Sequence, residues 1–197
     1  FARGPAGWNW LMWRGRVLSR DAHGQADTLA GVVMDIQPLK QAQSQLGVMA
    51  QRDPLTDLPN RALLADRLSH ALASARRNRS AFVVMDVQLE GVAPINEALG
   101  VEMGNHVIRQ AARRMATCTR ASDSVARTGN DEFVLLLENV EGTEDALAVA
   151  DKLRHHIHEP LVVDGHWLQV SASIGMAMYP AHGEDLAQLQ SHAAQAR

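Results

Sequence analysis

Gly129-Asn130-Asp131-Glu132-Phe133 lies between two runs of strand-forming residues, 125–128 and 133–137. Gly-Asn between apolar runs predicts a two-residue β-hairpin turn, because both central positions of such a turn favour positive φ, which Gly and Asn tolerate best. The turn would set two adjacent carboxylates, those of Asp131 and Glu132, beside it. Carboxylates are the ligands that Mg²⁺ uses together with substrate phosphates, so this stretch is a candidate site for metal and phosphate chemistry.

The composition is that of a globular chain. Its 197 residues are 46% hydrophobic and 21% charged, which suits one or two domains with a real core. No run approaches the ~18 apolar residues that a membrane span needs, and no signal-peptide pattern opens the sequence. The formal charge of −3 gives no basic surface for nucleic acid, and Cys118 is the only cysteine, so the expected setting is a reducing cytoplasm.

The first 36 residues have the pattern of β-structure. Trp8 and Trp10 alternate along one run, and a second run follows a turn at His23-Gly24. The sequence pattern of three stretches resembles the last strands of a PAS sensor domain; these are residues 13–15, 20–24 and 31–36. This resemblance predicts that residues 1–37 are the C-terminal part of such a domain.

A helix is predicted over residues 38–52. Leu39, Ala42, Leu46 and Met49 recur at alternating three- and four-residue spacing, which puts them on one stripe of a helix. The pattern is typical of a signalling helix. Two interpretations stay open: a linker that packs on its own domains, and a short dimeric coiled coil.

The remainder of the chain alternates helical and strand-like patterns. Helices are predicted over 61–79, 103–117 and 145–158, with an apolar strand over 81–87. Asp164-Gly165 predicts a second hairpin, between 161–163 and 167–178. This order indicates an α+β fold with a largely antiparallel sheet.

Residues 53–197 resemble the GGDEF family of diguanylate cyclases. The resemblance rests on Asp53-Pro54-Leu55-Thr56-Asp57-Leu58-Pro59-Asn60-Arg61, Ile95-Asn96-Glu97, Arg127 with Gly129–Phe133, and Ser173-Ile174-Gly175. One letter of the signature departs, because its second glycine is Asn130. The resemblance implies a palm-like domain, related to adenylyl cyclases, that condenses two GTP into cyclic di-GMP with Mg²⁺.

The resemblance also assigns the site residues. Asp131 and Glu132 take the catalytic and metal-binding positions, and Asn96, Asn105, Gly129 and Asn130 take the nucleotide-contacting positions.

The family's second metal ligand, a strand carboxylate, falls on Gln88, a neutral amide that is a poor substitute for a carboxylate. Asp86 lies on the same face of the strand, ~6 to 7 Å away, and is a substitute only if a two-residue insertion before Ile95 restores the register.

Two further departures weaken the expected cyclase. The family's phosphate-holding Lys corresponds to Ala93, and its guanine-contacting Asp corresponds to Asn105, which brings an unwanted donor. Asn130 adds a side chain where bare glycine would let a nucleotide approach. Asp131 and Glu132 are then either residual cation ligands or scaffold residues at a solvated turn.

A second site is predicted at Arg120-Ala121-Ser122-Asp123, which matches the position of the family's inhibitory Arg-x-x-Asp site for cyclic di-GMP. Arg pairs with guanine O6 and N7 in bidentate fashion, and Asp accepts from guanine N–H groups. The alternative is that Asp123 turns the chain after a helix and that Arg120 is a solvated cation.

The sequence therefore predicts a bacterial cyclic di-GMP signalling module. Its GGDEF domain is degenerate, impaired as a cyclase, and regulatory through nucleotide binding at Arg120 and Asp123. The alternatives are an active diguanylate cyclase and a nucleotide-free dimerisation scaffold. A homodimer and a downstream phosphodiesterase domain in the full protein are further expectations.

Overall fold

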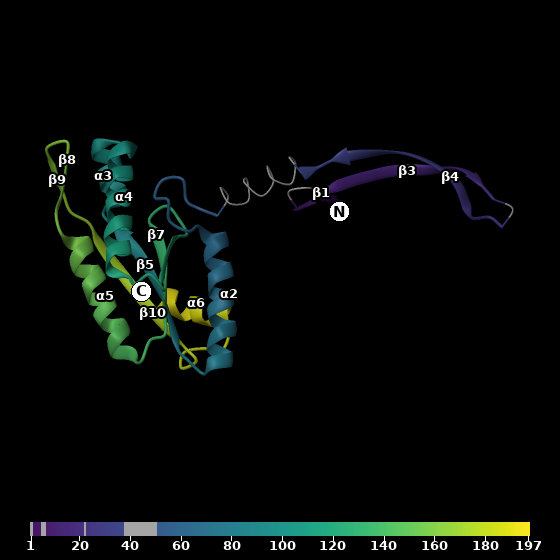
Figure 1. The fold of residues 1–197 in the computed structure, drawn as a ribbon. Coiled ribbons are helices and arrows are strands. Elements are labelled where there is room, and N and C mark those ends of the chain that lie inside the picture. The colour runs from purple at the N-terminus through teal and green to yellow at the C-terminus, as the bar shows by residue number, and fades with distance from the viewer. Residues whose placement is uncertain (1, 5–6, 22, 38–50) are drawn as a thin grey trace. The chain divides into compact units, whose positions relative to one another are not determined.

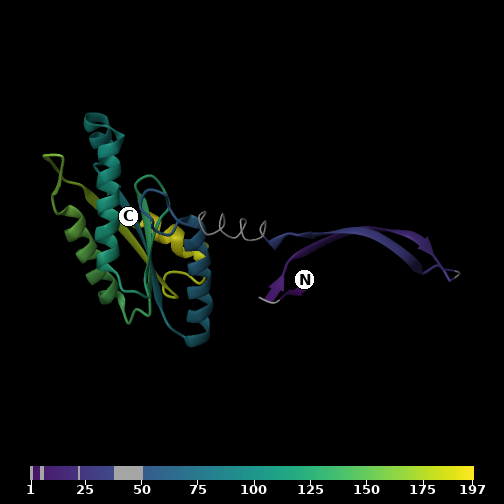
Figure 2. The ribbon, with the colours of Figure 1, turned by 45° about the horizontal axis from the view of Figure 1, so that its top comes forward.

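The computed structural model describes residues 2–4, 7–21, 23–37 and 51–197. The chain divides into two compact units, Phe1–Met49 and Ala50–Arg197. Figures 1 and 2 show both units. Within the described residues, no helix combines the length and the apolar character that crossing a membrane requires.

The first unit consists of paired strands. β1 (Ala2–Gly4) pairs with β2 (Gly7–Asn9), and β3 (Leu11–Arg20) pairs with β4 (Ala26–Asp35), both antiparallel. The prediction of β-structure over residues 1–36 is confirmed, and the assignment to a PAS domain stays a prediction. The predicted helix over 38–52 lies outside the described residues except for its last two positions.

A four-stranded sheet forms the centre of the second unit. Its strands are β5 (Phe82–Glu90), β6 (Ser124–Arg127), β7 (Glu132–Glu138) and β10 (Ser171–Tyr179). Their order is β10-β5-β7-β6, and every neighbouring pair is antiparallel. The expected α+β fold with an antiparallel sheet is confirmed.

Helices cover both faces of this sheet, as the two views in Figures 1 and 2 show. One face is covered by α4 (Val101–Cys118) and α5 (Thr143–His158), and the other by α2 (Arg61–Asn78) and α6 (Leu186–Gln195). Successive side chains of a strand point to opposite faces, so each central strand contributes to two cores. The residues of β5 in the α4/α5 core are Val83, Met85, Val87 and Leu89, and those in the α2/α6 core are Phe82 and Val84.

The helices begin and end near the predicted positions. Asn60 caps α2, because its side-chain oxygen accepts hydrogen bonds from the backbone N–H groups of Ala62 and Leu63. Two helices were not predicted: α6, and α3 (Val92–Leu99), which follows β5 directly. Both are short, at 10 and 8 residues, so neither carries enough turns for a helical repeat to stand out in the sequence.

The second predicted hairpin is partly confirmed. β8 (Leu161–Val163) pairs with β9 (His166–Leu168), and the φ angles of Asp164 and Gly165 are 48° and 80°, as the predicted turn requires. The prediction of one continuous strand from 167 to 178 is wrong. The chain leaves β9 after Leu168, and the next strand, β10, belongs to the central sheet.

The turn between β6 and β7 also differs from the prediction. Neither Gly129 nor Asn130 has a positive φ, so the two-residue turn is wrong. Thr128 donates its backbone N–H to the carbonyl oxygen of Glu132 at 3.0 Å, which closes a loop over 129–131. A Cβ on Gly129 would lie 2.6 Å from Oε2 of Glu132, so a side chain at this position would require the Glu132 side chain to shift.

Candidate functional site

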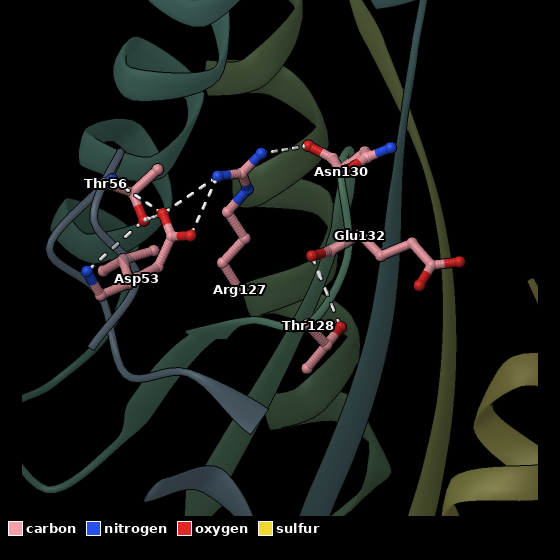
Figure 3. Close-up of polar contacts among 7 residues, drawn as sticks. Asp53, Thr56, Arg127, Thr128, Asn130 and Glu132 are labelled. Atoms are coloured by element: carbon pink, nitrogen blue, oxygen red, sulfur yellow. Dashed lines mark hydrogen bonds and ion pairs between the residues drawn. The ribbon is translucent and has the colours of Figure 1, made fainter. Parts of the chain in front are cut away.

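An ion pair fixes the hairpin loop to the start of the second unit (Figure 3). Nη1 of Arg127 lies 3.0 Å from each carboxylate oxygen of Asp53, and Nη2 donates to the carbonyl oxygen of Asn130 at 2.6 Å. Asp53 Oδ1 also accepts from the backbone N–H and the hydroxyl of Thr56, at 2.8 and 2.7 Å. Charge-assisted bonds of this kind are about twice as strong as neutral ones, so the pair holds the loop in place.

The environment of Asp53 favours its charged form. Burial alone would raise the pKa of the Asp53 carboxyl, but hydrogen bonds from Thr56 and Arg127 outweigh it and lower that pKa from its ordinary value of 3.8. Two more bonds join the same segments: the backbone N–H of Arg127 donates to the carbonyl oxygen of Pro59 at 2.9 Å, and Arg61 donates to that of Thr128 at 3.0 Å.

Gln88 stands at the strand position where the resemblance places a metal ligand. It lies directly opposite Glu132 across β5 and β7, and Asp86 lies opposite Val134. The pairing of β5 with β7 runs from Phe82 to Gln88 without a shift in register. The insertion before Ile95 that would bring Asp86 into the ligand position stays a prediction, and in this structure Gln88, not Asp86, lies opposite Glu132.

Asp86 and Gln88 are instead bound by one arginine. Nη1 of Arg197 lies 2.7 Å from Oδ1 of Asp86 and 3.1 Å from Oε1 of Gln88. Burial raises the pKa of the Asp86 carboxyl, the Arg197 guanidinium opposes that rise, and the Glu132 carboxylate adds to it, so that the pKa ends above its ordinary value of 3.8. Sequence reasoning missed Arg197, because nothing local connects residues 111 positions apart.

Asp131 is the last residue of the loop, and Glu132 is the first residue of β7. Figure 3 shows that the Glu132 side chain extends away from Arg127. The carbonyl oxygen of Asp131 accepts from the backbone N–H of Leu89 at 2.9 Å, so the two carboxylate residues are held against β5 by the main chain.

Glu90 is a further acidic residue at this end of β5 that sequence reasoning missed. Its carboxylate accepts hydrogen bonds from the hydroxyls of Ser171, at 3.1 Å, and Ser173. Its spacing of two residues from Gln88 and four from Asp86 was the available signal, because residues an even number of positions apart share one face of a strand.

These residues fit Mg²⁺ poorly. The ion needs near-octahedral oxygen ligands and normally takes carboxylates together with phosphates and waters. Here Gln88 offers a neutral amide whose oxygen already faces Arg197, and the Asp86 carboxylate is paired with the same guanidinium. No group of three metal-binding side chains occurs in the part of the chain that the structure describes.

The predicted nucleotide contacts in α3 and α4 are only partly intact. Oδ1 of Asn96 in α3 is buried and has no hydrogen-bond partner within the described ranges. Gly104 in α4 makes room for it, since a Cβ there would lie 1.9 Å from that oxygen. A buried acceptor without a partner is uncommon and makes Asn96 available to a donor from a ligand. Asn105, the next residue in α4, is half-buried.

Arg120 and Asp123 lie at a cavity of about 340 Å³ between the end of α4, the end of β7, and α5. Arg120 is exposed, and its guanidinium makes no hydrogen bond or ion pair within the described residues. Lys152 of α5 lines the same cavity, which gives it two cationic side chains. Sequence reasoning missed Lys152, because its place beside Arg120 depends on how α5 packs.

Asp123 has a structural role at this cavity. Its Oδ2 accepts from the backbone N–H of Arg120 at 2.8 Å, and its Oδ1 accepts from that of Glu138 at 3.3 Å. The carboxylate therefore holds the turn that presents Arg120, as the alternative interpretation expected. Each oxygen keeps a further lone pair, so this role and ligand binding are compatible.

The comparisons with known proteins agree with the fold. The sequence model described as "Diguanylate cyclase, GGDEF domain" matches residues 50–197. The chain belongs to the GGDEF domain family. A solved structure of the GGDEF domain of TpbB (YfiN) from Pseudomonas aeruginosa superposes with a TM-score of 0.72 at 38% identity, over 74% of this chain and 85% of that one.

Its relatives include proteins of cyclic di-GMP signalling. MucR of Pseudomonas aeruginosa, a bifunctional diguanylate cyclase/cyclic di-GMP phosphodiesterase, is 40% identical over 155 residues, which are 79% of this chain and 22% of MucR. The cyclic di-GMP phosphodiesterase PdeR of Escherichia coli is 31% identical over 160 residues, which are 81% of this chain and 24% of PdeR. The chain thus spans about a quarter of the length of these relatives.

Proposed function

We propose that this GGDEF domain is a regulatory module that binds cyclic di-GMP at the Arg120 cavity and does not act as a competent cyclase. The observation that carries the proposal is the contrast between two arginines. Arg120 is free to bind a ligand, whereas Arg197 pairs with Asp86 and Gln88 at the position where catalysis would need a metal.

Cyclisation of GTP makes demands that this chain meets poorly. A 3′-hydroxyl must attack an α-phosphate, and Mg²⁺, when bound, would stabilise the charge that develops there. Asp131 and Glu132 supply carboxylates, but Gln88 and Ala93 supply neither a carboxylate nor a cation. If loss of the metal ligand alone costs ~4 kcal/mol of transition-state stabilisation, the rate falls roughly a thousandfold.

Binding of cyclic di-GMP makes demands that the Arg120 cavity meets better. The Arg120 guanidinium has the geometry to pair with guanine O6 and N7, and the Lys152 ammonium supplies a cation for phosphate. Small-molecule cavities commonly measure ~300 to 1,000 Å³, so the site would hold part of the dinucleotide and leave the rest exposed. Asp123 keeps Arg120 in position.

A second candidate is binding of GTP, with or without slow turnover, in the catalytic half of the domain. The unpartnered Oδ1 of Asn96 favours it, together with the surviving carboxylates of Asp131 and Glu132. A cytoplasmic setting and a homodimer belong to the same proposal. The relatives named above are assigned to cyclic di-GMP synthesis or degradation, which supports a bacterial signalling role for this chain.

Isothermal calorimetry with cyclic di-GMP tests the proposal. We expect micromolar affinity, or about 8 kcal/mol, for the parent protein. Arg120→Ala should weaken binding by at least about thirtyfold, or about 2 kcal/mol, because it removes a bidentate base contact. Arg113→Ala, which removes an exposed arginine of α4 outside the cavity, is the control and should leave the affinity unchanged. Absence of heat, or equal affinity in parent and Arg120→Ala, would contradict the proposal.

Product analysis tests the catalytic half of the proposal. Incubation of the protein with GTP and Mg²⁺ or Mn²⁺, followed by chromatography, should give no cyclic di-GMP. Formation of product that is lost in Glu132→Ala would instead establish an active cyclase.

A further inference from the structure

Three polar side chains interrupt an apolar face of the central sheet. Asp86 and Gln88 alternate with buried residues of β5 and point to the side covered by α2 and α6, where Glu132 joins them from β7. The neighbours of Asp86 on this face, Val84 and Val134, belong to the apolar core. A carboxylate in such surroundings is costly unless it is paired, so the partner of Asp86 matters.

That partner is placed by close packing of the backbone. Gly175 of β10 lies directly opposite Asp86. A Cβ on Gly175 would lie 2.0 Å from the carbonyl oxygen of Ala193 and 2.5 Å from the backbone nitrogen of Arg197. The end of α6 therefore approaches the sheet at a glycine, and this approach sets Arg197 beside Asp86.

The contact has the character of a part-buried ion pair. The Asp86 and Arg197 side chains are 22% and 26% exposed, and one nitrogen of the guanidinium bonds both Asp86 and Gln88. Arginine keeps its charge at every physiological pH and donates N–H groups to the same oxygens that a metal ion would need as ligands.

We propose that Arg197 is the built-in cation of this centre: its guanidinium occupies the oxygens of Asp86 and Gln88 and excludes a divalent metal ion from them. A metal ion at these oxygens would have to displace the guanidinium or lie beside it, and like charges at such a distance repel. The guanidinium thereby balances the charge of Asp86 without any ion from solution. The inference deepens the proposed function, because it explains how the centre stays stable without metal.

Titration with Mn²⁺ alone, followed by electron paramagnetic resonance, tests the inference on the full chain without nucleotide. The parent should show only weak, non-saturable binding. Arg197→Met keeps most of the side-chain length and removes the charge, and it should raise the affinity for Mn²⁺ at least tenfold. Asp86→Asn added to Arg197→Met should abolish that gain. Arg113→Met makes the same change of net charge on the surface of α4 and should alter the affinity less than twofold.

A double-mutant cycle gives a second readout that needs no metal. In EDTA, Asp86→Asn and Arg197→Met should each lower the melting temperature. The fall in melting temperature of the double variant should be much smaller than the sum of the two single falls. Additive shifts, or an unchanged affinity of Arg197→Met for Mn²⁺, would overturn the inference. Cyclic di-GMP binding at Arg120 is measured in a separate experiment. If that binding is absent, the Mn²⁺ titration and the double-mutant cycle still test the role of Arg197.

Discussion

Asp53 and Arg127 are 74 residues apart in sequence, and their side chains are only 16% and 12% exposed. A charge-assisted ion pair that is this buried contributes more to the free energy of unfolding than a surface pair does. In a surface pair, screening by salt and the loss of side-chain entropy cancel most of the attraction. The pair therefore offers a direct test of what holds the hairpin loop.

Asp53→Asn should lower the free energy of unfolding by about 2 kcal/mol at pH 7, because it removes charge-assisted hydrogen bonds. Since the pKa of folded Asp53 is below its ordinary value of 3.8, the stabilisation is complete above that value and is lost as the pH falls through the folded pKa. Urea unfolding at pH 7 and in steps down to pH 3 should show the difference between parent and variant shrinking only below about pH 4.

Asp57→Asn is the matched control. The Asp57 side chain is 87% exposed, and Asn tolerates its φ of 57°. This variant should stay within about 0.5 kcal/mol of the parent. A difference for Asp53→Asn that is equally small, or constant with pH, would mean that the ion pair does not stabilise the domain.

Individual site residues differed in how far the sequence could place them. Gln88 was placed by counting back from Asn96 within the stretch that resembles the family, and the structure sets it directly opposite Glu132. Arg197 and Lys152 could not, because their positions depend on where α6 and α5 pack. The two-residue turn at Gly129-Asn130 was predicted wrongly. The loop spans residues 129–131, and neither Gly129 nor Asn130 has the positive φ on which the prediction rested.

At the scale of elements, the close approach of α6 to β10 is open to test. Gly175→Ala would put a Cβ against backbone atoms of α6, which cannot rotate away as a side chain can. We expect a loss of about 2 to 3 kcal/mol in the free energy of unfolding, as for other overpacked sites. Thermal and urea unfolding measure it.

Gly142→Ala is the control for a glycine in an open position, since a Cβ on it would meet nothing within 4 Å. Because Gly142 is the N-cap of α5, where Ala is less favourable than Gly, the change should cost about 1 kcal/mol, less than half of the larger loss expected for Gly175→Ala. Equal stability of Gly175→Ala and the parent would show that α6 can move off the sheet without cost.

Elements were predicted best where apolar residues repeat. Leu64 and Leu68, both buried in α2, gave that helix to within one residue of its observed end. In α6 only Leu189 and Ala193 are buried, so the sequence carried too little periodicity to predict it. β9 and β10 were merged, because Gln169 and Val170 carry no turn signal that would separate them.

At the scale of the whole molecule, the predicted stripe of Leu39, Ala42, Leu46 and Met49 bears on assembly. We expect the protein to dimerise through this segment, and we expect Leu46→Glu to halve the mass measured by light scattering, because a charge in an apolar seam is costly. Gln45→Glu, one position along the chain and off the stripe, should keep the parent's mass. A parent and a Leu46→Glu variant of equal mass would place any interface elsewhere.

The tie between Asp53 and Arg127 joins the first turn after residue 51 to the loop that carries Asp131. Arg127 touches both ends of this connection, since it bonds the Asp53 carboxylate and the Asn130 carbonyl oxygen. A pull on the chain ahead of Asp53 would reach the loop through this ion pair and through the bonds of Pro59 and Arg61 to Arg127 and Thr128. The domain thus has a short mechanical connection between its first residues and the carboxylate loop.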